Sequence, residues 1–222
     1  MSPEYAPAPD PKNAIADKLE MDIIFGRLAP AQRLIEDDLM ARFGTSRHKV
    51  RGAIDMLTIR GMAVRETNKG AHVCSYTGAE ILQIYELRNI LQDAAIGKIS
   101  FPVDPAIIAT LRSIDAAHVA AASTDAFDEV FHLNNLFHQT VFSCCNNPAL
   151  AEAIEVQARR TVPIRTNNFM RTGYLSLAQS EHKKMIDALK HGNAEALTLL
   201  TRTHMMRPMR DYLSQYNLAQ RN

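Results

Sequence analysis

Hydrophobic residues recur at helical spacing over most of the chain, and only one short stretch alternates as strands do. In the first third, apolar stripes of this kind predict helices within residues 12–26, 36–43 and 46–57. Alternating positions followed by turn residues favour two short strands at residues 62–65 and 71–74. This order of elements predicts a winged helix-turn-helix with a small β-hairpin.

From residue 79 onward the hydrophobic pattern is helical alone. Breaks at proline, glycine and asparagine clusters divide it into six stretches, which predicts an antiparallel all-helical bundle. We therefore expect a mainly α fold in three parts. These are a disordered tail over residues 1–10, a winged helix-turn-helix domain over residues 11–76 and a helical domain over residues 79–218.

Composition is that of a globular protein, with 46% hydrophobic residues and a formal net charge of +1 in 222 residues. The charge is unevenly spread, since Arg42–Lys69 holds seven cations against two acids. Such a focus of positive charge is typical of nucleic-acid binding. The three cysteines, Cys74, Cys144 and Cys145, have no disulfide or metal-binding spacing. With neither a signal peptide nor a long apolar segment in the sequence, we expect a cytoplasmic protein without a membrane span.

The helix predicted within residues 46–57 carries the chemistry of a DNA-recognition helix. Ser46 stands at its N-cap position, and its first turn exposes Arg47, His48, Lys49 and Arg51. Cations at this end can contact phosphates and base edges, where backbone N–H groups also attract anions. The predicted wing would approach the adjacent groove or backbone through Asn68, Lys69 and Gly70. Paired half-sites on a short palindromic operator in double-stranded DNA then predict a homodimer.

Polar side chains interrupt three apolar stripes of the helical region. Asn134 and His138 face inward one turn apart, and His182 and His204 interrupt two later stripes. One imidazole from each of three helices suits a divalent metal such as zinc. A single inward histidine is, however, more often a hydrogen-bonded core residue than a ligand. Spacing along the chain cannot show that the three converge.

Both halves of the sequence resemble a known family of regulators. The first half resembles the N-terminal domain of GntR-family bacterial transcription regulators through Leu34-x-Glu36-x-x-Leu39-x-x-x-Phe43-Gly44-x-Ser46-Arg47-x-x-Val50-Arg51. It departs from that pattern at Ala31 and Gly52. The second half resembles the FCD effector domain of the FadR subfamily, in its shorter six-helix, VanR-like form. The motifs concerned are Asn134-x-x-Phe137-His138 and Glu181-His182-x-x-x-Ile186.

The resemblance implies a transcription regulator, expected to be a repressor, whose operator binding is controlled by a small carboxylate beside a metal. The family's metal ligands map onto Asn134, His138, His182 and His204. Asn134 stands where the family usually has Asp, so the only anionic ligand is lost, although an amide oxygen can still coordinate. We expect zinc, with nickel or another transition metal as alternatives. Asn134 and Arg88 map onto the effector pocket.

Several alternatives remain open at this level. An internal salt bridge would explain Arg88, and a solvated face would explain Arg159, Arg160 and Arg165 as well as a place in the pocket. His118 and His132 receive no role. The helical domain could also be vestigial, without an effector. A metal-dependent hydrolase is a further alternative, but the sequence indicates no inward Asp or Glu beside the histidines to act as a base, so we expect no enzyme.

Overall fold

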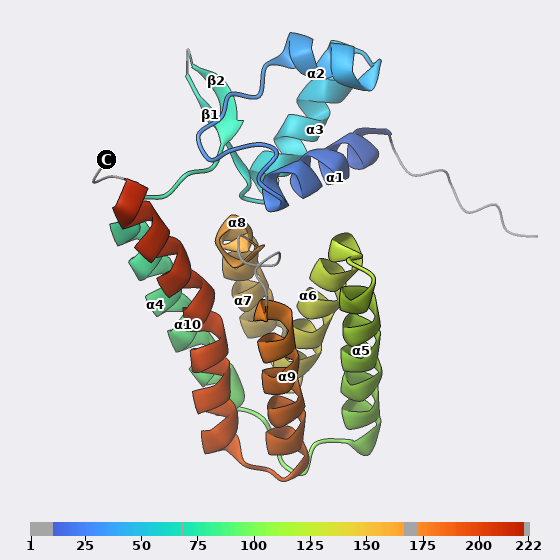
Figure 1. Cartoon of the computed structure of the whole chain (residues 1–222), viewed down its shortest axis with the longest axis vertical. Coiled ribbons are helices and arrows are strands. Elements are labelled where there is room, and N and C mark those ends of the chain that lie inside the picture. Colours follow the sequence, from blue (N-terminus) through green and yellow to red (C-terminus); the bar gives the residue numbers. More distant parts are fainter. Residues whose placement is uncertain (1–10, 68, 167–172, 220–222) are drawn as a thin grey trace, which may run out of the picture. The chain divides into compact units, whose positions relative to one another are not determined.

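The computed structural model describes residues 11–67, 69–166 and 173–219 (Figure 1). Close contacts divide the chain into two compact units between Ser75 and Tyr76. The predicted tail and Asn68 of the wing lie outside the described residues. The fold is mainly α with one small antiparallel hairpin, as the sequence predicts. No helix among the described residues combines the length and hydropathy that a membrane crossing requires.

The first unit is a winged helix-turn-helix. Its elements are α1 (Pro11–Ile24), α2 (Glu36–Phe43), α3 (Arg47–Ile59), β1 (Ala63–Glu66) and β2 (Gly70–Val73). The strands pair from Ala63 opposite Val73 to Glu66 opposite Gly70. The core forms where the apolar faces of α1 and α3 meet, with Leu19, Val50, Ala53, Ile54 and Leu57 fully buried. The apolar stripes therefore predict both the helices and the faces that they bury.

The boundaries of α2 and α3 follow from local chemistry. Three acids, Glu36–Asp38, occupy the first turn of α2, where they stabilise the helix dipole. Gly44 ends α2 in the left-handed region at φ 57°. Ser46 occupies the N-cap of α3, but its side chain makes no capping hydrogen bond, which corrects the sequence prediction. Its carbonyl oxygen instead accepts from the Lys49 and Val50 amides at 3.0 and 3.2 Å.

The second unit is an antiparallel helical bundle (Figure 1). Its helices are α4 (Gly78–Ile96), α5 (Pro105–Ser123), α6 (Phe127–Ser143), α7 (Pro148–Arg160), α8 (Val162–Thr166), α9 (Tyr174–Lys190) and α10 (Ala194–Ala219). Helix α5 packs against α6 and α9, and α10 packs against α9 and α4. The centre of the bundle is apolar and fully buried at Ala95, Leu111, Met185, Leu189 and Leu197. This packing places one face of α6, α9 and α10 around a common interior.

Six of these helices correspond to the predicted ones, and the five-residue α8 is an addition. Helix α7 ends at Arg160, and Thr161 makes a turn before α8 begins. Pro163 has no N–H to continue the hydrogen-bond ladder of α7, although proline is compatible with the first turn of a new helix. The Thr161 hydroxyl instead donates to the Ala158 carbonyl at 3.0 Å. Arg165, in the short helix α8 that follows this break, is buried.

Candidate metal centre and DNA-binding surface

Three helices bring one histidine each into a tight cluster. His138 of α6, His182 of α9 and His204 of α10 offer ligand nitrogens that all lie within 4.8 Å of one another. The Nε2 atoms of His138 and His204 are 3.2 Å apart. Two nitrogens on one tetrahedral zinc, each bonded at 2.0–2.1 Å, are separated by about 3.3 Å. The donor type of the cluster and the spacing of its His138–His204 pair therefore fit a metal site.

Burial keeps these imidazoles in the form that metals bind. His182 is fully buried, and His138 and His204 are largely so. Burial lowers the pKa of all three rings, most strongly for His138, where the nearby His204 and His182 lower the pKa further. A neutral imidazole presents a free lone pair, so a metal would have little competition from protons near neutral pH.

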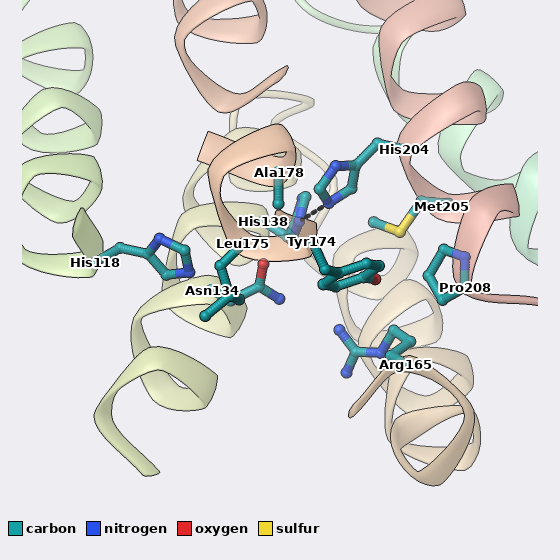
Figure 2. Close-up of a pocket in the computed structure, with 10 residues that line it drawn as sticks. All are labelled: His118, Asn134, His138, Arg165, Tyr174, Leu175, Ala178, His204, Met205 and Pro208. Carbon is teal, nitrogen blue, oxygen red and sulfur yellow. Dashed lines mark hydrogen bonds between the residues drawn. The ribbon is translucent and has the colours of Figure 1, made fainter. Parts of the chain in front are cut away.

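A small pocket adjoins the histidine cluster (Figure 2). Its free volume is about 20 Å³, which is room for roughly one water molecule or ion. Asn134 lines the pocket with His138 and His204, so the fourth residue of the predicted ligand set shares a cavity with two of the three histidines. Further lining side chains are His118, Arg165, Tyr174, Leu175, Ala178, Met205 and Pro208. Metal-binding donors and a cation thus share one cavity.

Two buried acids stand beside the histidines, which corrects the expectation that none would. Glu181 of α9 accepts a hydrogen bond from Nδ1 of His204 at 2.8 Å and another from Arg207 at 2.9 Å. Burial raises its pKa, but these two hydrogen bonds outweigh burial and lower it to about 2. Asp115 of α5 lies 3.7 Å from Nδ1 of His182. Asp115 and Glu181 follow the apolar stripes of their helices, and this spacing is the signal that could have revealed them.

His118 is a fourth histidine at this site, although the sequence pattern indicates no role for it. It is buried on α5, its ring lies 5.4 Å from that of His182, and it lines the pocket. Burial, followed by repulsion from His182, lowers its pKa to about 4. The alanines around it obscure a helical stripe that runs through Leu111, Ile114 and His118.

Arg88 and Arg165 are both buried, but only Arg165 lines the pocket. Arg88 donates to the Thr161 hydroxyl and, at 3.1 Å, to the Met205 sulfur. Within the described part of the chain it pairs with no carboxylate, which disfavours the salt-bridge alternative. Arg165 donates to the side-chain Oδ1 atom of Asn135 at 3.2 Å. Burial and the neighbouring Arg88 charge lower the pKa of Arg165 to about 10.

The cations of α3 are largely engaged by acids of α2. Arg51 pairs with Glu36 at 2.9 Å, and Arg47 pairs with Asp37 and, at 3.6 Å, with Glu36. His48 and Lys49 are exposed beside them, and no ion pair involves either among the described residues. The Ser46 hydroxyl makes no bond to α3. In the wing, Lys69 pairs with Glu66 at 2.7 Å, and Gly70 has φ 82°.

Comparison with known proteins decides the family. Residues 11–73 match the family described as bacterial regulatory proteins, gntR family, and residues 83–207 match the FCD domain. The chain belongs to the GntR family. This GntR regulator combines the family's helix-turn-helix domain with an FCD domain, as in FadR-like members. The family consists of transcription regulators, which removes the hydrolase alternative.

Individual relatives agree with this assignment. The GntR regulator is 23% identical over 181 residues to the HTH-type transcriptional regulator YdhC of Bacillus subtilis, covering 81% of each chain. It is 27% identical over 128 residues to the gluconate operon transcriptional repressor of the same species, covering 57% of this chain and 52% of that one. Its fold resembles that of Escherichia coli McbR/YncC, with a TM-score of 0.71 and 20% identity over 94% of this chain and all of that one.

Proposed function

We propose that this GntR regulator is a homodimeric repressor whose affinity for a short palindromic operator is set by a small organic acid bound beside a divalent metal. The cluster of His138, His182 and His204 inside the FCD domain is the observation that carries the proposal. FCD domains commonly bind metal. Similarity to a gluconate operon repressor favours repression.

The proposed ligands are Asn134, His138, His182 and His204, with zinc as the preferred ion and nickel as an alternative. Three neutral imidazoles suit zinc, and the Asn134 amide oxygen, beside them in the pocket, offers a fourth donor. A bound metal would supply a Lewis-acidic centre that attracts an oxygen anion. The chain's own residues hold that centre and shape the space around it.

Arg165 is the proposed anchor for the acid. It is a buried cation in the wall of the same pocket as the histidines, and guanidinium groups bind carboxylates through paired hydrogen bonds. Arg88 adds positive charge behind it. The cavity holds only about 20 Å³, so an organic acid requires side chains such as Tyr174 to shift. Tighter binding to the shifted state is the differential affinity through which an effector acts.

The metal part of the proposal is tested by elemental analysis of the purified full-length protein after zinc exposure and gel filtration. We expect one zinc per wild-type chain and its loss in His138→Ala, because three ligands from three helices hold the ion. His132→Ala is the matched control, since His132 is exposed on the same helix. If the wild-type protein contains no zinc after gel filtration, the proposed metal centre is wrong.

A second candidate is a regulator whose helical domain has no effector. It is favoured by the small cavity and by Asn134 in place of an acid. A thermal-shift screen of the zinc-treated protein against small carboxylates separates the two. Stabilisation by an acid supports the effector, whereas no shift from zinc and none from any acid supports the second candidate.

A further inference from the structure

The proposed ligand set is electrically neutral, which leaves a charge to be balanced. Three imidazoles and the Asn134 amide carry no charge when they bind a divalent cation. The buried guanidinium groups of Arg165 and Arg88 add positive charge near the same site. A buried and uncompensated charge is costly, since it has lost its hydration. Nearby negative groups therefore decide whether this site can hold its ion.

Two buried carboxylates lie directly behind two of the histidines. Glu181 accepts from Nδ1 of His204, and Asp115 lies within ion-pair range of Nδ1 of His182. Both acids are buried, with 6% of Glu181 and 5% of Asp115 exposed to solvent. They reach the cluster from different helices, α9 and α5.

The bond from His204 to Glu181 fixes which nitrogen is available. With the proton of His204 held on Nδ1 toward Glu181, its Nε2 carries the lone pair, and this is the atom that faces His138. Carboxylates that hold the outer nitrogen of a histidine orient the ring and raise its basicity toward a metal. By contrast, Nδ1 of His138 and Nδ1 of His182 make no hydrogen bond among the described residues, and Asp115 lies 3.7 Å from the latter atom.

The two acids differ in whether a neighbouring cation offsets their negative charge. Glu181 also binds Arg207 of α10, so a cation already offsets part of its charge. Asp115 meets no arginine or lysine within the described part of the chain. Glu181 is thus best placed to orient a ligand, and Asp115 is best placed to supply uncompensated negative charge.

We propose that Glu181 and Asp115 are positioning residues of the metal centre. They lie behind the histidines and supply the negative charge that the neutral Asn134 does not provide. Glu181 holds His204 in the binding tautomer. Asp115 balances the ion through His182. This inference rests on the proposed metal centre and concerns how that centre functions without an anionic ligand.

Zinc affinity of the full-length protein, measured by competition with a chromophoric chelator, tests the role of Glu181. Glu181→Ala is expected to weaken zinc binding by roughly 10–100-fold. Glu181→Gln should recover part of the loss, because its amide oxygen can still accept from His204. Arg207→Gln is the control for structure alone: it breaks the ion pair between α9 and α10 but leaves the carboxylate on His204, so zinc affinity should hold. An equal loss of zinc affinity in Arg207→Gln would show that Glu181 acts only by stabilising the packing of α9 on α10.

The role of Asp115 is tested by exchanging the position of the charge. Asp115→Asn should weaken zinc binding by roughly 10-fold, and adding Asn134→Asp should restore it by placing a carboxylate directly on the ion. The absorption spectrum of the cobalt-substituted protein reports whether the ligand geometry is kept. If Asp115→Asn and Glu181→Ala both bind zinc as wild type does, the inference is overturned while the metal centre stands. If the wild type binds no zinc, both are overturned.

Discussion

At the level of single residues, Arg165 brings the positive charge to the pocket, whereas Arg88 lies against Thr161 and Met205. The positions of both along their helices indicate only that they can face inward. Arg165 lies on α8, after the turn at Thr161, and it is the one of the two that lines the cavity. Binding of an acid should therefore depend more on Arg165 than on Arg159 and Arg160 of α7.

Arg165→Gln should weaken binding of a stabilising carboxylate by roughly 30-fold or more, because removing one partner of a buried charge pair costs about 2–5 kcal/mol. Zinc content should remain, since Arg165 is not a ligand. Titration by thermal shift, with the acid found most stabilising in the carboxylate screen, measures the effect. Arg159→Gln is the control, because Arg159 pairs with Glu155 at 2.7 Å away from the pocket lining. Unchanged affinity for the acid in Arg165→Gln would show that Arg165 does not anchor the carboxylate.

The buried His118 predicts a pH dependence of the metal-free protein. Its folded pKa of about 4 lies below the value of 6.5 for an ordinary histidine. The unfolded chain therefore binds more protons between these values, and stability should fall as the pH is lowered from 6.5 towards 4. Denaturant unfolding in the presence of a chelator measures this slope. His118→Gln should make it shallower, and an unchanged slope would contradict the assignment.

At the level of elements, the cations of α3 that are proposed to contact DNA are already partly neutralised by acids of α2. Glu36 of α2 accepts hydrogen bonds from Arg51 of α3 and forms a looser ion pair with Arg47 at 3.6 Å. Phosphates must compete with that carboxylate for the two guanidinium groups. If Arg47 and Arg51 contact DNA as proposed, this arrangement would hold them in a defined direction and limit their attraction to nucleic acid that lacks the matching bases.

Glu36→Gln is expected to strengthen binding to unrelated DNA and to narrow the gap between unrelated DNA and the operator, because it frees Arg47 and Arg51. Mobility-shift titrations with the gene's own upstream region and with a scrambled fragment measure both affinities. Asp125→Asn, a charge change in the helical unit, serves as the control. If the ratio of the two affinities is preserved in Glu36→Gln, the carboxylate has no part in discrimination.

Lys49 is the exposed cation of α3 without an ion pair among the described residues. Lys49→Ala should weaken binding to all DNA sequences alike. It should also reduce the slope of log affinity against log salt concentration by about 0.9 for each of its phosphate contacts that is lost. Titrations at several salt concentrations give the slope, with Lys190→Ala as the control. A sequence-specific loss would instead indicate that Lys49 reads a base.

At the level of the whole molecule, the two units have separate cores, and the histidine cluster belongs to the second one alone. Zinc should therefore stabilise the helical unit by about 2.7 kcal/mol at a concentration of 100 times its dissociation constant. Scanning calorimetry should show that one unfolding transition moves with zinc, and that His138→Ala abolishes this movement. Equal movement of every transition would show that the units unfold as one.

The sequence by itself determined the elements and the faces that they bury. Helical spacing marked the winged helix-turn-helix, the bundle and the inward position of His138, His182 and His204, because periodicity along one helix fixes which side chains share a face. The short α8 escaped prediction, since a five-residue helix has too few positions to show a period.

Only the tertiary structure decided which inward residues meet. Distances between helices depend on how whole faces pack, so the convergence of three histidines, the acids Glu181 and Asp115 behind two of them, and the place of Arg165 could not be obtained from spacing. The ion pairs of Arg47 and Arg51 likewise could not be obtained from spacing, since the local charge balance along the chain includes both cations but not Glu36. Glu36 lies far enough away along the chain that only the packing of α2 on α3 brings their charges together.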